Sequence, residues 1–140
     1  VRCKMKRTTL INRHLSTLVA RLGHLDEILV TDAGFPMPKD VDVIDLAVIP
    51  GLPRFLDVIK ALRSELIIEE AILAEEVSPG LLADMQGELD AWTKEVGKEI
   101  TLSEVSHEAL KERASRSKAI IRTGETTPYA NLILVSGVSF

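Results

Sequence analysis

Two short segments near opposite ends of the chain contain most of the polar side chains whose types suit chemistry on a small ligand. One segment contains His24 and Asp32, and the other contains Tyr129 and Asn131. Together they offer an imidazole, a carboxylate, a phenol and an amide, which can donate and accept several hydrogen bonds. Each lies beside an apolar run, where a rigid strand can position it. The set predicts a binding site for a ligand rich in hydroxyl groups, such as a sugar.

His24 and Asp32 lie eight positions apart, before and after a predicted strand. Histidine changes protonation state near neutral pH and can both give and take a proton, so His24 is a candidate catalytic residue. On this residue alone, a surface loop histidine is an equal alternative. Asp32 follows the carboxyl end of the strand, where open α/β sheets place their ligands. It could also form an Asx turn with Gly34, and both interpretations can hold together.

Tyr129 and Asn131 are two positions apart. If this segment is extended, their side chains leave the same face while Ala130 points away. Such a pair can bind neighbouring hydroxyls without adding charge. Pro128 stiffens the approach to the pair, and Gly124 permits the preceding turn. The alternative is that Tyr129 is only an aromatic residue at the edge of the sheet.

The other histidines give weaker signals. His107 and Lys111 are four positions apart and therefore share one helical face. Taken alone, this pair indicates a solvated face more than a site. His14 lies at the margin of the first apolar stripe and receives no role.

Metal and cofactor sites have little support in the sequence. Asp40, Asp42 and Asp45 cluster, but the third does not share a strand face with the first two, and no histidine lies beside them. The chain has no glycine-rich phosphate motif and no nucleophile-elbow motif. We therefore expect neither a metal nor a cofactor.

Composition limits the function classes. The chain has 140 residues and a net charge of −4 with no basic run, which disfavours a nucleic-acid surface. Aromatic residues make up 4%, so the core must be aliphatic. Cys3 is the single cysteine, and no apolar run approaches the length of a membrane span, roughly 18 residues. The amino terminus carries no hydrophobic region of a signal peptide. These features predict one domain over residues 5–140, no membrane partner and a cytoplasmic location, with residues 1–4 as a cloning remnant or an upstream extension.

Hydrophobic periodicity predicts alternating helices and strands. We expect Thr9 to cap the first helix and Gly23 to end it in a left-handed conformation, while Pro53 opens the second helix and Ser78 caps the third. The predicted helices cover residues 10–22, 53–66, 79–92 and 106–117. The predicted strands cover residues 28–30, 43–49, 67–74, 100–105, 119–122 and 132–135. This order predicts an α/β domain whose mixed, mostly parallel sheet is covered on both faces.

Several of these segments also resemble a known family. The chain is similar to the RbsD/FucU family of monosaccharide mutarotases from residue 5 to 140, and between residues 75 and 103 it matches only in helical character. The resemblance rests on residues 9–12, 21–24, 32–36, 50–53 and, most specifically, 122–131. The fucose branch typically has a histidine after Asp-Ala in the first motif and Tyr-Gly-Asn in the last. Here Gly34 and Ala130 occupy those places, so the ribose branch is the better match.

The resemblance implies a three-layer α/β/α fold and ring-shaped homo-oligomers, of the pentamer or decamer type, with sites near subunit boundaries. It implies interconversion of the β-pyranose and β-furanose forms of D-ribose, which supplies furanose for ribose utilisation without a cofactor or a metal. His24 would be the proton donor and Asp32 would bind substrate. The same pocket would be lined by His107, Lys111, Tyr129, Asn131 and the backbone around Ala130.

Three alternatives stay open from the sequence. One is a non-catalytic ribose-binding accessory protein, which needs the binding residues but no titrating group at position 24. Another is a mutarotase for a different monosaccharide such as fucose. A third is a structural ring component with a vestigial pocket. The catalytic prediction requires His24 to meet Asp32, Tyr129 and Asn131 around one sugar, either within one subunit or across a boundary.

Overall fold

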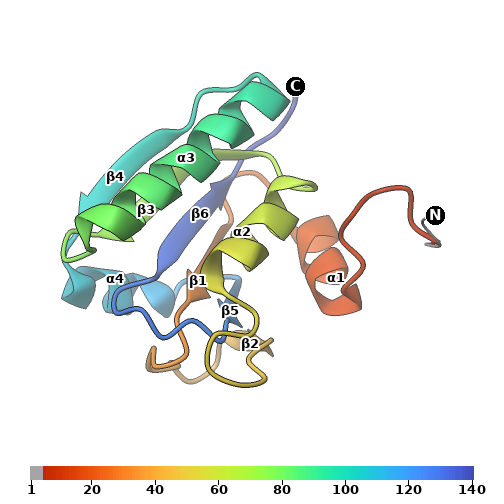
Figure 1. Ribbon diagram of the computed structural model, residues 1–140. Coiled ribbons are helices and arrows are strands. Elements are labelled where there is room, and N and C mark those ends of the chain that lie inside the picture. The colour runs from red at the N-terminus through yellow and green to blue at the C-terminus, as the bar shows by residue number, and fades with distance from the viewer. Residues whose placement is uncertain (1–4) are drawn as a thin grey trace.

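Six strands form one mixed sheet in the computed structural model, which describes residues 5–140 (Figure 1). The strands are β1 (Glu27–Thr31), β2 (Asp42–Asp45), β3 (Ile68–Ala74), β4 (Thr101–Val105), β5 (Ala119–Arg122) and β6 (Leu132–Ser136). Their order in the sheet is β2-β5-β1-β6-β3-β4. Strand β6 runs antiparallel to both of its neighbours, whereas every other pair is parallel. The predicted mixed, mostly parallel sheet is confirmed.

Helices cover both faces of this sheet. They are α1 (Arg13–Arg21), α2 (Phe55–Arg63), α3 (Pro79–Val96) and α4 (His107–Ala114). The buried side chains of α1, α2 and α3 pack in one core cluster with Ile28 and Val30 of β1. Leu29, between them in the strand, packs on the opposite face with Phe35 and with Leu110 of α4. This alternation along β1 produces the three layers of an α/β/α fold. Within residues 5–140, none of these helices combines the length and the apolar character that crossing a membrane requires.

The first helix begins and ends differently from the prediction. Its N-cap is Asn12, whose side-chain oxygen accepts a hydrogen bond from Leu15 N–H at 3.0 Å. Thr9 was therefore the wrong cap, because asparagine three residues closer satisfies the free amide. The helix leaves through Leu22 in an extended conformation, so a left-handed Gly23 was also wrong. The residue with positive φ is Leu25, in the turn that follows.

The second predicted strand is shorter than expected. It ends at Asp45, whose Oδ1 accepts a hydrogen bond from Ala47 N–H at 3.0 Å and turns the chain out of the sheet. Residues 47–49 then fold back, and Val48 N–H donates to Leu52 O. Pro53 precedes the N-cap residue Arg54 instead of opening the helical turn. Ser78 caps α3 through a bond from Leu81 N–H, as predicted.

The direction of β6 determines which segments meet. Asp32 follows β1, His107 follows β4, and residues 123–125 follow β5, so all three come from carboxyl ends of parallel strands. Asn131 precedes the antiparallel β6 and therefore reaches the same edge of the sheet. We call this the carboxyl edge. His24 precedes β1 and lies at the opposite edge, which we call the amino edge.

Candidate functional site

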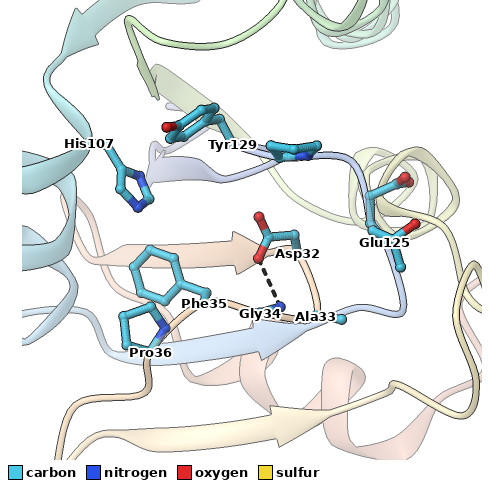
Figure 2. Close-up of a pocket in the computed structure, with 10 residues that line it drawn as sticks. Asp32, Ala33, Gly34, Phe35, Pro36, His107, Glu125 and Tyr129 are labelled. Atoms are coloured by element: carbon cyan, nitrogen blue, oxygen red, sulfur yellow. Dashed lines mark hydrogen bonds between the residues drawn. The ribbon is translucent and has the colours of Figure 1, made fainter.

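A cavity of about 440 Å³ opens at the carboxyl edge (Figure 2). Its walls come from the segment after β1, the first residue of α4 and the segment between β5 and β6. Figure 2 shows Asp32, His107 and Tyr129 around the same space, with Phe35 below them. The cavity is lined by Asp32, Ala33, Gly34, Phe35, Pro36, His107, Glu125, Thr126, Pro128 and Tyr129.

Asp32 is fixed in place by one hydrogen bond of its backbone and one of its side chain. Its N–H donates to Asn131 Oδ1 at 3.0 Å, and its own Oδ1 accepts from Gly34 N–H at 3.0 Å. The second bond is the predicted Asx turn, and Figure 2 marks it. Burial raises the pKa of Asp32 above its ordinary value, although the bond from Gly34 and the nearby His107 work against the rise. A hydrogen bond from a ligand hydroxyl would stabilise the charged form, so this carboxylate is suited to bind a sugar.

His107 is held by the start of its helix and by two aromatic rings. Its backbone N–H donates to the Glu76 carboxylate at 3.0 and 3.2 Å. The imidazole meets Tyr129 and Phe35 edge to face, with ring centroids 5.1 and 6.0 Å away. Such edge-to-face pairs restrict ring orientation. Among residues 5–140, His107 Nδ1 is buried without a hydrogen-bond partner. A buried polar atom of this kind is a natural contact for a ligand.

Tyr129 does not lie on a strand. Pro128 and Tyr129 form a turn, and Tyr129 has a φ of 63°, a left-handed conformation that is rare for a bulky residue. The condition under which Tyr129 and Asn131 would share one strand face is therefore not met, because β6 begins only after this turn. Strain of this kind concentrates at ligand sites, where the surrounding structure maintains it. The turn places the phenol at the cavity, where the side chain is partly exposed.

Asn131 and Ala130 have supporting positions. Asn131 is completely buried, and its Oδ1 orients the backbone of Asp32. Its Nδ2 has no hydrogen-bond partner within the described part of the chain. Ala130 is also completely buried and packs in the larger core cluster. Of the predicted residues at this end of the chain, Tyr129 lines the cavity, whereas Ala130 and Asn131 are buried and not among its lining residues.

Glu125 was missed as a site residue although it lies inside the second motif. Its carboxylate accepts bonds from Phe55 N–H at 3.1 Å and from Thr127 Oγ1 at 2.8 Å. Burial acts to raise the pKa of Glu125, but these bonds outweigh it, and the net pKa lies below the ordinary value. Glu125 O also accepts from Ala33 N–H at 2.8 Å, which joins the two motifs. The sequence offered one signal for the missed lining residues Glu125, Thr126 and Pro128. They lie next to Tyr129 in the same motif, and Glu125 is anionic.

Lys111 lies outside the residues that line the cavity. Its Nζ is 2.7 Å from Glu108 Oε1, one helical turn away. Two of the acidic residues near β2 are also paired, because Arg21 contacts Asp42 at 3.5 Å and Arg122 contacts Asp45 at 3.0 Å. No group of three potential metal-ligand side chains lies together in the part of the chain that the structure describes.

His24 is not near the cavity of its own chain. It lies in a turn before β1, and its Nε2 is 3.0 Å from Glu69 Oε1 at the start of β3. Asp32 lies beyond the other end of β1, and a five-residue strand spans about 17 Å. The structure therefore brings Asp32, His107, Tyr129 and Asn131 together and leaves His24 at the amino edge.

Comparison with known proteins identifies the family of the chain. The RbsD / FucU transport protein family matches residues 5–139. The chain belongs to this family. The resemblance inferred from the motifs of the sequence is thus confirmed, and so is the α/β/α fold that it implied.

Relatives within the RbsD/FucU family match along nearly the whole chain. The D-ribose pyranase of Vibrio parahaemolyticus is 51% identical over 139 residues, covering 97% of this chain and 100% of the relative. The D-ribose pyranase of Photobacterium profundum is 52% identical with the same coverage.

Solved structures of the family share the architecture. Bacillus subtilis RbsD complexed with D-ribose has a TM-score of 0.84 and 40% identity, and the match covers 97% of this chain and 100% of that chain. The fucose mutarotase of Streptococcus pneumoniae in complex with L-fucose has a TM-score of 0.74 and 24% identity, covering 94% and 96%. At that identity the second comparison concerns the fold alone.

Proposed function

We propose that this protein is a D-ribose pyranase, which interconverts the β-pyranose and β-furanose forms of D-ribose. The observation that carries the proposal is the identity of about one half, over nearly the full length, to relatives of that name. The B. subtilis relative, at 40% identity, was solved with D-ribose. The cavity supports the same ligand class, because Asp32, His107 and Tyr129 offer it a carboxylate, an imidazole and a phenol.

The reaction opens one hemiacetal ring and closes another. A proton must reach the departing ring oxygen, and a proton must leave the anomeric hydroxyl. The sugar keeps its composition and its oxidation state, so proton transfer and correct orientation suffice. Asp32 accepts a hydrogen bond from a sugar hydroxyl, while the Tyr129 phenol and the His107 imidazole contact the neighbouring groups. The fixed Asx turn at Asp32 pre-orients its carboxylate for this contact.

We propose His24 as the proton donor, acting in the cavity of a neighbouring subunit of a ring-shaped homo-oligomer. The support is its position: it lies at the amino edge with half of its side chain exposed, so it can reach another subunit but not its own Asp32. In a ring built from head-to-tail contacts, the amino edge of one copy can face the carboxyl edge of the next. Lys111 is proposed to lie near the substrate, although its ammonium group is paired with Glu108 in this structure. A cytoplasmic location completes the proposal, since the single cysteine suits a reducing compartment.

Saturation-transfer NMR on D-ribose tests this function. The parent protein is expected to accelerate exchange between pyranose and furanose signals. His24→Ala is expected to reduce the catalysed rate by about 10²–10⁴-fold while ribose binding is retained, because general acid catalysis contributes this much. His14→Ala is the matched control: this exposed histidine lies on α1 and has no proposed role, so the parental rate is expected.

Other outcomes identify the alternatives. Ribose binding without faster exchange would support an accessory binding protein. Faster exchange of L-fucose than of D-ribose would make the protein a fucose-type mutarotase. Absence of binding to either sugar would favour a structural ring component. If His24→Ala exchanges ribose as fast as the parent, His24 is not the proton donor.

A further inference from the structure

We propose that Glu69 is a positioning residue for His24, and that its bond to Nε2 leaves Nδ1 as the nitrogen that exchanges the proton. This inference rests on the proposed function, in which His24 is the acid. Glu69 is the second residue of β3, and its Oε1 lies 3.0 Å from His24 Nε2. No motif in the sequence pointed to it, because 45 positions separate the two residues.

The chemistry of the pair determines which nitrogen reacts. An ionised carboxylate can only accept hydrogen bonds, so the hydrogen in this contact belongs to His24 Nε2. In the neutral imidazole, Nδ1 is then the free acceptor, and after protonation Nδ1–H is the free donor. Carboxylate partners fix ring orientation and tautomer in this way around other functional histidines. The His24 side chain is half exposed, so Nδ1 remains accessible to a ligand held by another subunit.

Glu69 is itself fixed by a second partner. Its Oε2 lies 3.5 Å from Lys98 Nζ, which also donates to Val138 O at 3.1 Å. Lys98 comes from the segment between α3 and β4, so three separate parts of the chain meet around one carboxylate. With Lys98 on one oxygen, the other oxygen stays directed at His24. His24, Glu69 and Lys98 are the titratable groups in contact here, and we refer to them as the amino-edge triad.

The backbone around His24 is held by several hydrogen bonds, so the rotation of its side chain is what a partner can still fix. Asp26 N–H donates to Gly23 O at 3.2 Å, and Gly23 N–H donates to Asp26 Oδ2 at 2.7 Å. Leu25 N–H donates to Ser136 O, and Leu25 is held at a φ of 71°. A bulky residue in this left-handed region is strained and indicates a functionally constrained turn. Glu69 then selects one orientation of the imidazole on this fixed turn.

A role in stability does not explain the pair well. The two side chains are 50% and 28% exposed, and exposed ion pairs contribute little to folding. Removing the Glu69 carboxylate is therefore expected to change the exchange reaction more than the thermal unfolding curve.

The test combines kinetics with the tautomer of His24. Glu69→Ala is expected to lower kcat about tenfold with little change in KM, in line with the loss of an orienting carboxylate. Glu69→Gln is expected to lose less, because its amide oxygen can still accept from Nε2–H. Long-range ¹⁵N–¹H NMR on neutral His24 is expected to report the Nε2–H tautomer in the parent and a mixture of tautomers in Glu69→Ala.

Glu70→Ala is the matched control. It removes the adjacent carboxylate of the same strand, which accepts from Ser103 Oγ at 3.1 Å and makes no contact with His24. The parental rate and the parental His24 tautomer are expected. A tenfold loss in this control would mean that Glu69→Ala acts by disturbing β3, which would overturn the inference.

A double variant separates this inference from the proposed function. If Glu69 acts through His24, then His24→Ala with Glu69→Ala is no slower than His24→Ala alone, because the two losses share one cause. A further tenfold loss in the double variant would overturn the inference. A parental rate in Glu69→Ala, found together with a slow His24→Ala, would also overturn the inference. A parental rate in His24→Ala would instead refute His24 as the proton donor, and the role of Glu69 with it.

Discussion

The two edges of the sheet hold their functional groups in opposite ways. At the carboxyl edge, Asp32, His107 and Tyr129 surround a cavity and are oriented by hydrogen bonds and ring contacts. At the amino edge, the triad around Glu69 is partly exposed and forms no part of that cavity. Binding a sugar requires enclosure, whereas delivering a proton to another subunit requires accessibility. Under the proposed function, each copy of the chain would supply two different halves of a site.

The largest expected effect comes from mixing two inactive variants. His24→Ala lacks the proposed donor and is expected to be slower by about 10²–10⁴-fold. Asp32→Ala lacks the binding carboxylate and is also expected to be slow, because it binds ribose weakly. In a head-to-tail ring, each site takes Asp32 from one copy and His24 from the next. Rings refolded from an equal mixture are expected to recover about one quarter of the parental rate, since about a quarter of the sites combine two intact halves. Saturation-transfer NMR on the mixture measures this recovery.

Two controls make the mixing result specific. Each variant refolded alone must stay slow, and a mixture combined without refolding must stay slow while subunits do not exchange. A refolded mixture that is no faster than its components would contradict the division between the two edges. His24 would then have to act within its own chain or not at all.

The next largest effect concerns Gly124, which packs closely against the backbone of residues 49–52 and lies at the carboxyl edge. A Cβ at Gly124 would lie 2.5 Å from Leu52 O and 2.8 Å from Ile49 O, both backbone atoms. Gly124→Ala is therefore expected to lower the free energy of unfolding by about 2 kcal/mol, a typical cost of overpacking. It should also weaken ribose binding, because Gly124 precedes the lining residues Glu125 and Thr126. Thermal unfolding and ribose titration measure the two effects.

Gly87→Ala provides the comparison for this substitution. Gly87 lies within α3, and a Cβ there would meet nothing within 4 Å. The variant is expected to gain roughly 0.5–1 kcal/mol in stability, because alanine is the better helix former. The His24 tautomer should be parental in both glycine variants. A changed tautomer in Gly124→Ala would mean that the two edges are not independent.

Much of the carboxyl edge could be predicted from the sequence, for identifiable reasons. Asp32 follows an apolar strand and precedes a glycine, and both its place and its Asx turn are local properties. The left-handed Tyr129 could not be predicted, because bulky residues rarely adopt this conformation without long-range support. The cap at Asn12 and the early end of β2 at Asp45 depend on single side-chain bonds that compete with other nearby residues.

The amino edge illustrates a different limit. The sequence placed His24 before a strand and Asp32 after it, which already implied opposite edges of one sheet. What the sequence lacked was the partner: Glu69 lies 45 positions from His24 along the chain and contacts it, and Lys98 contacts Glu69 in turn. Periodicity predicts strands but not which strands become neighbours. Contacts made through that order therefore need the structure.

The smallest expected effect distinguishes two carboxylates within the carboxyl edge. The pKa of Asp32 is raised, chiefly by burial, so its ionisation costs stability as the pH rises through that pKa. Asp32→Asn removes this cost and is expected to raise the free energy of unfolding at neutral pH by up to about 1 kcal/mol, a limit set by its partial exposure. The gain should vanish in acid, where the parent carboxyl is protonated.

Glu125 has a lowered pKa, so its contribution to stability is present above the normal carboxyl pKa and is lost as the pH falls. Glu125→Gln should therefore destabilise the protein at neutral pH and have little effect in acid. Thermal unfolding at both pH values checks the opposite signs; if Asp32→Asn also destabilises at neutral pH, Asp32 supports the fold and is not a strained group kept for its ligand.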